Sequence, residues 1–461
     1  MVFSSIPFLY YFLPLVILFY LAAPKKLKNP VLLLSSIVFY AWGEPRYVFL
    51  MLGTVLANYI LGILIEKHRG RPLAKVYMTV SAVLSLGALG YFKYADFFIE
   101  NFNRATGLSV GLLNIALPIG ISFYTFQILS YTIDVYRGNV KAQKNFITLA
   151  TYVALFPQLI AGPIVRYIDV ERELVSRTHS FEKISVGISR FVTGLSKKVL
   201  LANTLGELCA FFQGTSDKSV LFYWLYVVAY MLQVYFDFSG YSDMAIGLGK
   251  IFGFEFLENF NYPFISKSIT EFWRRWHISL GTWFRDYVYI PMGGNRVNKG
   301  RMLFNIFTVW FLTGFWHGAE WNFIVWGLFF GVFLTLEKFF YRSYVEKSRV
   351  FGHIYVLFLT AISFAIFGAG SMKEAVTFVG GMFGANALPL VSQTFIYTLK
   401  NYWLVLAVGI IASTPLWKRV ITPKTEKVWA VLKIPVLVLL LILTTAFLAD
   451  GAFNPFLYFR F

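Results

Sequence analysis

The sequence predicts an all-α, polytopic integral membrane protein with about 11 to 13 membrane-embedded helices, some of them short or re-entrant. Its 461 residues are 58% hydrophobic and only 14% charged, which excludes an ordinary soluble protein. The 41 Lys and Arg residues outnumber the 23 Asp and Glu residues, and the basic residues cluster between long apolar runs. Positive cytoplasmic loops and contact with anionic membrane lipids explain this pattern, so no nucleic-acid partner is expected.

Three basic clusters divide the first third of the chain. The apolar run at residues 7–23 is expected to be the first span, because no basic segment precedes it as in a signal peptide. Basic residues follow at 25–28, 67–75 and 137–144, and the positive-inside rule places all three clusters in the cytoplasm. Breaks at Gly43-Glu-Pro45 and at residues 101–107 divide the intervening apolar sequence into pairs of helices.

This arrangement predicts that the N-terminal residues lie outside the cytoplasm and that the loop at residues 67–75 lies inside. Single cysteines placed at Ser4 and at Arg71, in a Cys209→Ser background, test the topology. An impermeant thiol reagent added outside is expected to label position 4 and not position 71. Equal labelling of both positions from outside would overturn the topology.

The apolar run at residues 219–254 carries two acids, Asp237 and Asp243. Acids at membrane depth pair with a cation or line an aqueous path. Two interpretations stay open: the acids contact substrate, or they form buried ion pairs with Arg274, Arg275 or Arg285.

The stretch at residues 268–340 is the most strongly patterned part of the chain. Ser268-Ile-Thr-Glu271 is typical of a capping box, so a helix is expected to start there and to end before Pro291. On such a helix Trp273, Trp276 and His277 share one side, and the arginines lie opposite. The amphipathic pattern favours an interfacial helix, with His277 as an aromatic anchor or as a functional group.

Residues 302–340 are almost continuously apolar but are broken at His317-Gly-Ala-Glu320. A single helix would be roughly 58 Å long, against a hydrocarbon core of about 30 Å. Two short helices that meet near Gly318 are therefore expected. Broken helices at membrane depth are tolerated where they line a cavity, which favours a central funnel with His317 at its wall.

Several motifs together resemble the membrane-bound O-acyltransferase family, and in particular its bacterial alginate O-acetyltransferase branch. The central motifs are Ile269-Thr-Glu-Phe-Trp-Arg-Arg-Trp-His-Ile-Ser-Leu280, Trp283-Phe-Arg-Asp-Tyr-Val-Tyr-Ile-Pro291, Gly293-Gly-Asn-Arg296 and Leu312-Thr-Gly-Phe-Trp-His-Gly318. Others are Leu117-Pro-Ile-Gly-Ile-Ser-Phe-Tyr-Thr-Phe126, Phe236-Asp-Phe-Ser-Gly-Tyr-Ser-Asp243 and the ending Asn454-Pro-Phe-Leu-Tyr-Phe-Arg-Phe461. The resemblance covers the whole chain. It implies one transmembrane domain over residues 1–461, with N-terminal spans at 1–145, a catalytic core at 146–340 and C-terminal spans at 341–461.

The resemblance also implies the roles of individual residues. It makes His317 the catalytic base and His277 the second catalytic histidine, because a buried neutral imidazole can accept a hydroxyl proton. Expected substrate contacts are Trp273, Arg274, Arg275, Trp276, Trp316, Asp237, Asp243 and Arg296. Arg274, Arg275 and Arg296, with Lys299 and Arg301, suit the phosphates of a donor, although positive-inside topology explains the same charges.

The donor is expected to be cytosolic acetyl-CoA, with no tightly bound cofactor. No metal is expected either, since Cys209 is the single cysteine and the two histidines stand forty positions apart without acidic partners. The acceptor is expected to be an extracytoplasmic polysaccharide, alginate-like or cellulose-like, or a periplasmic or extracellular acetylase partner. The expected location is the bacterial inner membrane.

Two other functions stay open. The first is an acyltransferase that takes its acyl group from a carrier-protein thioester, as in D-alanyl transfer to teichoic acid. The second is a polysaccharide-export transporter without enzymatic activity, which the embedded acids and broken helices alone would fit. A transporter would move its cargo without cleaving a thioester.

Overall fold

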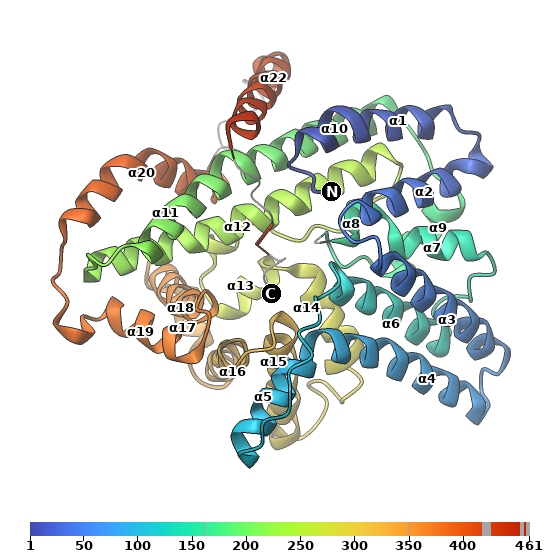
Figure 1. Cartoon of the computed structure of the whole chain (residues 1–461), viewed down its shortest axis with the longest axis horizontal. Coiled ribbons are helices and arrows are strands. Elements are labelled where there is room, and N and C mark those ends of the chain that lie inside the picture. Colours follow the sequence, from blue (N-terminus) through green and yellow to red (C-terminus); the bar gives the residue numbers. More distant parts are fainter. Residues whose placement is uncertain (161, 349, 417–425, 452–455, 458–461) are drawn as a thin grey trace. The chain divides into compact units, whose positions relative to one another are not determined.

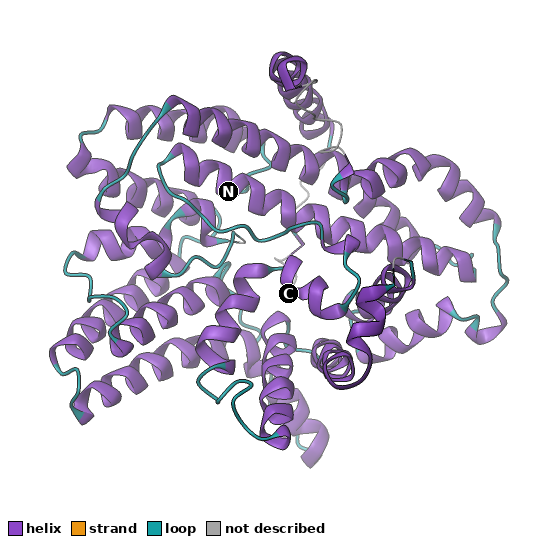
Figure 2. Ribbon diagram, turned by 180° about the vertical axis from the view of Figure 1, so that it is seen from behind, coloured by secondary structure: helices purple, strands orange, loops and turns teal. Residues whose placement is uncertain are grey.

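The computed structural model describes residues 1–160, 162–348, 350–416, 426–451 and 456–457, and within these ranges it contains helices and no strand (Figures 1 and 2). Within these described ranges, six helices are long and apolar enough to cross a membrane: Tyr47–Lys67, Pro72–Thr106, Val220–Ile251, Trp321–Lys347, Gln393–Ala412 and Val428–Asp450. Phe8–Ala22 and Phe351–Phe367 are shorter apolar helices. The predicted all-α, multi-pass membrane fold is confirmed.

The helices gather into two units, Met1–Phe191 with Ser242–Leu257, and Val192–Tyr241 with Glu258–Phe461. The first unit holds the π-helix η1 (Phe8–Phe12), the 3₁₀-helix η2 (Lys25–Leu27), the π-helix η3 (Gly90–Tyr94), α1 (Leu13–Ala22), α2 (Lys28–Ala41), α3 (Tyr47–Lys67), α4 (Pro72–Leu89), α5 (Ala95–Thr106), α6 (Ile121–Arg137), α7 (Phe146–Ala154), α8 (Phe156–Leu159), α9 (Tyr167–Val175) and most of α10 (Phe181–Ser196). Helices α3, α4 and α6 pack on one another (Figure 1). The predicted break at Gly43-Glu-Pro45 is confirmed, because α2 ends at Ala41 and α3 begins at Tyr47.

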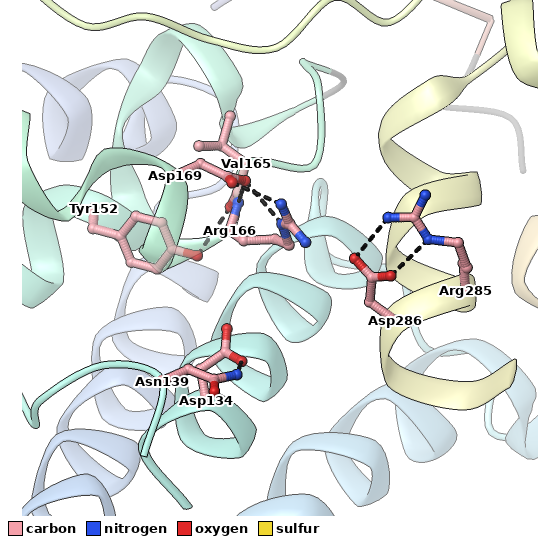
Figure 3. Close-up of polar contacts among 8 residues, drawn as sticks. All are labelled: Asp134, Asn139, Tyr152, Val165, Arg166, Asp169, Arg285 and Asp286. Carbon is pink, nitrogen blue, oxygen red and sulfur yellow. Dashed lines mark hydrogen bonds and ion pairs between the residues drawn. The ribbon is translucent and has the colours of Figure 1, made fainter. Parts of the chain in front are cut away.

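Polar contacts fix the ends of two helices in the first unit (Figure 3). The guanidinium of Arg166 donates to both carboxylate oxygens of Asp169 at 2.9 and 2.8 Å, at the start of α9. The Asn139 amide donates to the Asp134 carboxylate at 2.9 Å, just after α6 ends. The Asn139 backbone amide also donates to the Asp134 carbonyl at 2.9 Å, which satisfies one of the carbonyls that the end of α6 leaves unpaired.

The second unit contains both patterned histidines. Its elements are the π-helix η4 (Lys197–Asn203), α11 (Thr204–Gly214), α12 (Val220–Ile251, as far as Tyr241), η5 (Pro263–Ile265), α13 (Ile269–Arg275), α14 (Ile278–Phe284), the π-helix η6 (Arg285–Tyr289), α15 (Lys299–His317), α16 (Trp321–Leu336), the π-helix η7 (Glu337–Tyr341), α17 (Arg342–Lys347), α18 (Phe351–Phe367), α19 (Met372–Met382), η8 (Ala385–Ala387), α20 (Gln393–Ala412) and α22 (Glu426–Asp450). Of the ending motif 454–461, only Phe456 and Leu457 lie within the described residues.

Helices α15 and α16 pack side by side in this unit (Figure 1). Their backbones approach closely at two glycines. A Cβ atom on Gly327 would overlap the carbonyl oxygen of Trp310, and one on Gly314 would overlap that of Phe323. Small residues allow such contact between helices in a membrane protein.

Candidate active site

The predicted helix start at Ser268 is confirmed. The Ser268 hydroxyl accepts a hydrogen bond from the Glu271 amide at 3.1 Å, and α13 begins at the next residue, Ile269. The Glu271 carboxylate accepts from the Lys267 amide at 2.9 Å instead of from the Ser268 amide. The buried carboxylate of Glu337, from η7, accepts from the amides of Ile269 and Thr270 at 2.5 and 2.9 Å, so a distant helix holds this helix start in place.

The prediction of one helix that continues to Pro291 is wrong. Helix α13 ends at Arg275, and His277 adopts a left-handed conformation, with φ 45° and ψ 52°, before α14 starts at Ile278. Asn259 makes this turn possible, because its backbone oxygen accepts from the Ile278 amide at 3.0 Å and its side chain from the Ser279 amide at 3.1 Å. A left-handed non-glycine residue costs about 1–3 kcal/mol, and such strain gathers at functional sites.

The predicted break after His317 is confirmed. His317 is the last residue of α15, Gly318 is extended, and α16 starts at Trp321. The His317 side chain is buried among aromatic rings. Its ring centroid lies 4.9 Å from that of Trp326, 5.0 Å from that of Trp316 and 5.4 Å from that of Phe367.

The two histidines meet at one small cavity. Their ring centroids are 6.5 Å apart, with the ring planes at 69°. The cavity has a volume of about 30 Å³, room for roughly two water molecules. It is lined by Val234, Asp237, Phe238, Phe272, Trp273, Trp276, His277, His317, Trp326, Phe330, Phe364, Phe367, Phe456 and Leu457.

His277 is neutral in this cavity. The turn that carries it lies outside the six candidate spans, and burial lowers its pKa to about 3. Neither of its ring nitrogens makes a hydrogen bond to another of the described residues. At neutral pH the ring therefore offers one N–H donor and one unprotonated nitrogen to a ligand.

Asp237 does have a cation partner, but it is not one of the arginines considered from the sequence. The Lys198 ammonium, from η4, lies 2.5 Å from its carboxylate, and both side chains are almost fully buried. The Leu457 amide also donates to this carboxylate at 2.9 Å. Asp237 thus lines the cavity as part of an ion pair, and it ties Leu457 to the cavity wall.

Asp243, the second acid of α12, pairs with another cation. It belongs to the first unit, where its carboxylate accepts from the guanidinium of Arg190 at 2.8 Å. The two acids of α12 therefore pair with different cations, Lys198 and Arg190.

A second, larger cavity of about 650 Å³ opens in the same unit. Trp273 lines both cavities and forms part of the wall between them. The lining includes apolar residues of α14 and α15, namely Ile278, Leu280, Ile306 and Val309, and several basic residues from other elements. Its full set of lining residues is Thr270, Trp273, Arg274, Ile278, Leu280, Gly281, Thr282, Phe284, Arg285, Tyr289, Asn295, Ile306, Val309, Trp310, Thr313, Leu334, Lys338 and Arg342.

Among the described residues, those that line this second cavity include no carboxylate and four cations: Arg274, Arg285, Lys338 and Arg342. Two of these cations form ion pairs with acidic residues. Arg285 pairs with Asp286 at 2.7 Å (Figure 3), and Arg342 pairs with Glu346 at 2.8 Å. The cavity therefore keeps an excess of positive charge, which favours an anionic ligand.

The Gly293-Gly-Asn-Arg296 turn helps to position one of these cations. Gly293 and Gly294 both have positive φ angles, and the turn that they form presents the Asn295 side chain. The Asn295 oxygen accepts from the Tyr289 hydroxyl at 2.7 Å and from the Lys338 ammonium. Lys338, on η7, is thereby held at the cavity.

The structure separates the basic residues that the sequence grouped together. Arg274 lines the second cavity, whereas Arg275 binds Glu271 at 2.8 Å and the Asn261 carbonyl at 3.1 Å. Arg296 is exposed on the turn after η6. Arg275 and Arg296, with Lys299 and Arg301, are not among the described residues that line either cavity.

The aromatic residues of the prediction lie close to the histidines. Trp273 and Trp276 line the histidine cavity. The Trp316 ring centroid lies 6.0 Å from that of His277 and 5.0 Å from that of His317. Both histidines and all three tryptophans therefore lie at or beside the histidine cavity.

Sequence reasoning missed Asn259, Lys198, Trp326 and Lys338. Lys198 stands in an apolar run, so its charge at membrane depth was a usable signal for a buried pair with an acid. Trp326 and Lys338 lie in the same 302–340 stretch as His317 but carry no distinctive spacing. Their roles depend on contacts between separate helices.

Comparison with known proteins places this chain among membrane acyltransferases. The model of the membrane-bound O-acyltransferase family matches residues 138–369, which include both histidines. The probable alginate O-acetylase AlgI of Azotobacter vinelandii is 42% identical over 420 residues, covering 89% of this chain and 84% of that protein. A peptidoglycan O-acetyltransferase of Helicobacter pylori is 32% identical over 85% of this chain and 81% of its own length. A teichoic acid D-alanyltransferase of Bacillus subtilis is 32% identical over 49% of this chain and 60% of its own length.

Proposed function

Because this chain belongs to the membrane-bound O-acyltransferase family, we propose that it transfers acetyl groups from cytosolic acetyl-CoA toward an extracytoplasmic polysaccharide. The acceptor is an alginate-like or cellulose-like hydroxyl, reached directly or through an extracytoplasmic acetylase partner. The enzyme works in the bacterial inner membrane. The name of the Azotobacter relative supports both the acetyl group and the polysaccharide acceptor.

One observation carries the proposal: two buried histidines face a single cavity at a helix break. His317 and His277 are 5% and 1% exposed, and their rings are 6.5 Å apart. Both histidines lie at helix boundaries, since α15 ends at His317 and α14 begins after His277. A neutral imidazole that is buried beside a cavity suits proton removal from a hydroxyl.

In the proposed reaction His317 removes the proton from the acceptor hydroxyl while that oxygen attacks the thioester carbonyl carbon. Neutral His277 orients the acceptor or the thioester through its own N–H or its unprotonated nitrogen. The Lys198 ammonium neutralises Asp237, so the cavity wall brings no net negative charge against the developing oxyanion. A direct transfer of this kind needs no covalent acyl-enzyme.

The second cavity is the proposed donor site. Its excess of positive charge suits the phosphates of CoA, and its apolar side, lined by α14 and α15, suits the pantetheine arm. Trp273 stands between this cavity and the histidines. The histidine cavity is too small to hold both substrates, so its side chains must shift when they bind.

Donor choice tests the proposal. The purified protein, reconstituted in lipid vesicles with an oligosaccharide acceptor, is offered labelled acetyl-CoA or a carrier-protein thioester in parallel. Formation of an acetyl ester with stoichiometric CoA release is the expected result. Transfer from the carrier thioester alone would contradict acetyl-CoA as donor and favour the function named for the Bacillus relative.

Neutralising Arg274 and Arg275 together is expected to weaken donor use more than it weakens folding. The loss of a charge-assisted contact with phosphate, about 1.5–3 kcal/mol, raises the KM for acetyl-CoA by about tenfold or more. The two single variants show which arginine accounts for the change in the KM for acetyl-CoA. Arg274→Ala is expected to carry the KM change, and Arg275→Ala serves as the matched control because Arg275 binds Glu271 instead. An unchanged KM in the double variant would leave lipid contact as the role of these charges.

A further inference from the structure

Trp326 is a buried hydrogen-bond donor in the histidine cavity. It lies on α16, its side chain is 4% exposed, and its indole nitrogen has no hydrogen-bond partner within the described part of the chain. Trp224 illustrates the usual arrangement, since its indole nitrogen donates to the Met382 carbonyl at 2.9 Å. Buried indole N–H groups nearly always find an acceptor, so the indole nitrogens of Trp326 and Trp273, which both line this cavity and both lack a partner within the described residues, need an explanation. Of these two rings, that of Trp326 contacts the ring of His317.

The Trp326 ring is held firmly at the cavity. It meets the His317 ring edge to face, with centroids 4.9 Å apart and ring planes at 84°. Phe330 packs against it at 5.4 Å and Phe367 at 5.1 Å. The next residue, Gly327, lies against the Trp310 carbonyl of α15, the helix that ends at His317. The Trp326 indole and the His317 imidazole are therefore held by two helices that pack against each other, α16 and α15.

The chemistry of the indole limits what its N–H can bind. An indole nitrogen donates and does not accept, so its ligand in the cavity must offer an acceptor atom. His277 is less selective, because a neutral imidazole can donate or accept. Acyl transfer places its developing negative charge on the carbonyl oxygen of the acyl group, and a preformed donor stabilises that charge strongly in a dry site.

We propose that the Trp326 indole N–H donates to the carbonyl oxygen of the acyl group and stabilises the tetrahedral oxyanion. This role rests on the proposed acyltransferase function. As the acceptor oxygen bonds to the carbonyl carbon, its proton passes to His317 and the carbonyl π electrons move to the oxygen that Trp326 binds. The oxyanion then collapses, the carbon–sulfur bond breaks, and the leaving thiolate takes the proton from His317.

Removal of this one N–H, with the ring shape kept, tests the role. Trp326 is replaced with 3-benzothienylalanine, an isostere in which sulfur takes the place of the N–H. The reconstituted protein is expected to lose about a hundredfold in kcat, as when one oxyanion donor is removed, with little change in the KM for acetyl-CoA. Its thermal stability is expected to stay the same or rise, because no internal hydrogen bond is lost.

The same replacement at Trp224 is the matched control. It removes an indole N–H that does have a protein partner, so it is expected to lower stability and to leave kcat per folded molecule unchanged. Trp326→Phe is a second variant, expected to lose at least as much turnover as the isostere. A kcat within twofold of wild type in the isostere would overturn the role of Trp326. An inactive wild-type protein would instead refute the acetyltransferase function itself, and this role with it.

Discussion

His317→Ala is expected to lower acetyl transfer at least about a hundredfold, roughly 3 kcal/mol of barrier, in a protein that still folds and inserts. The substitution removes the proposed base at the last residue of α15, so no later turn of that helix depends on it. Donor binding is expected to change little, because His317 is not among the residues that line the basic cavity. The measurement is turnover in reconstituted vesicles, with acetyl-CoA binding and thermal unfolding followed on the same preparation.

His68→Ala is the control for this experiment. His68 follows α3 on a basic loop, its ring bonds only locally to the Leu64 carbonyl, and its loss is expected to leave turnover unchanged. His277→Ala is expected to be damaging as well, but partial activity is compatible with an orienting role. Near-normal turnover by a folded His317→Ala protein would remove the base from the mechanism and favour a transporter.

Breaking the buried ion pair is expected to have the second largest effect, and this effect is on stability. Removing Lys198 or Asp237 alone leaves the other charge buried without its partner, which costs about 3–5 kcal/mol. Lys198→Met and Asp237→Leu are each expected to lower the thermal unfolding temperature and the yield of monodisperse protein. The double variant is expected to regain much of that loss, because neither charge then remains.

A surface ion pair provides the comparison. Glu255→Ala removes a half-exposed carboxylate that binds Lys250 and Lys183, and is expected to change stability by less than about 1 kcal/mol. Equal stability of the single and double variants at Lys198 and Asp237 would contradict a buried pair. The double variant also tests Asp237 as a substrate contact, since full activity in it would assign the carboxylate a structural role only.

The helix boundaries were predictable wherever a local signal sets them. Ser268 and Glu271 have the spacing of a helix start, and the helix begins there. The polar break His317-Gly-Ala-Glu320 in an overlong apolar run predicted the turn between α15 and α16, and the turn is present. Composition predicted a membrane protein, because soluble proteins are rarely 58% hydrophobic, and the long apolar runs predicted its helices.

The shape of the site was not predictable, because it depends on contacts between distant segments. The left-handed turn at His277 is stabilised by Asn259, eighteen positions earlier, and no helical pattern in the sequence indicates it. Lys198 reaches Asp237 across 39 positions, and Lys338 reaches Asn295 across 43. The sequence pointed to two histidines and three tryptophans that the structure brings together, but it did not show which cation each acid binds or that two cavities share Trp273.

The most direct test of the account is a single-turnover measurement on the purified protein in sealed vesicles. Labelled acetyl-CoA is supplied on the cytoplasmic face, with a deacetylated polysaccharide oligomer on the other face. We expect a labelled O-acetyl ester to form on the acceptor side, one CoA to be released for each ester, and His317→Ala to abolish both. Movement of label or oligosaccharide across the membrane without thioester cleavage would contradict the proposed acetyl transfer.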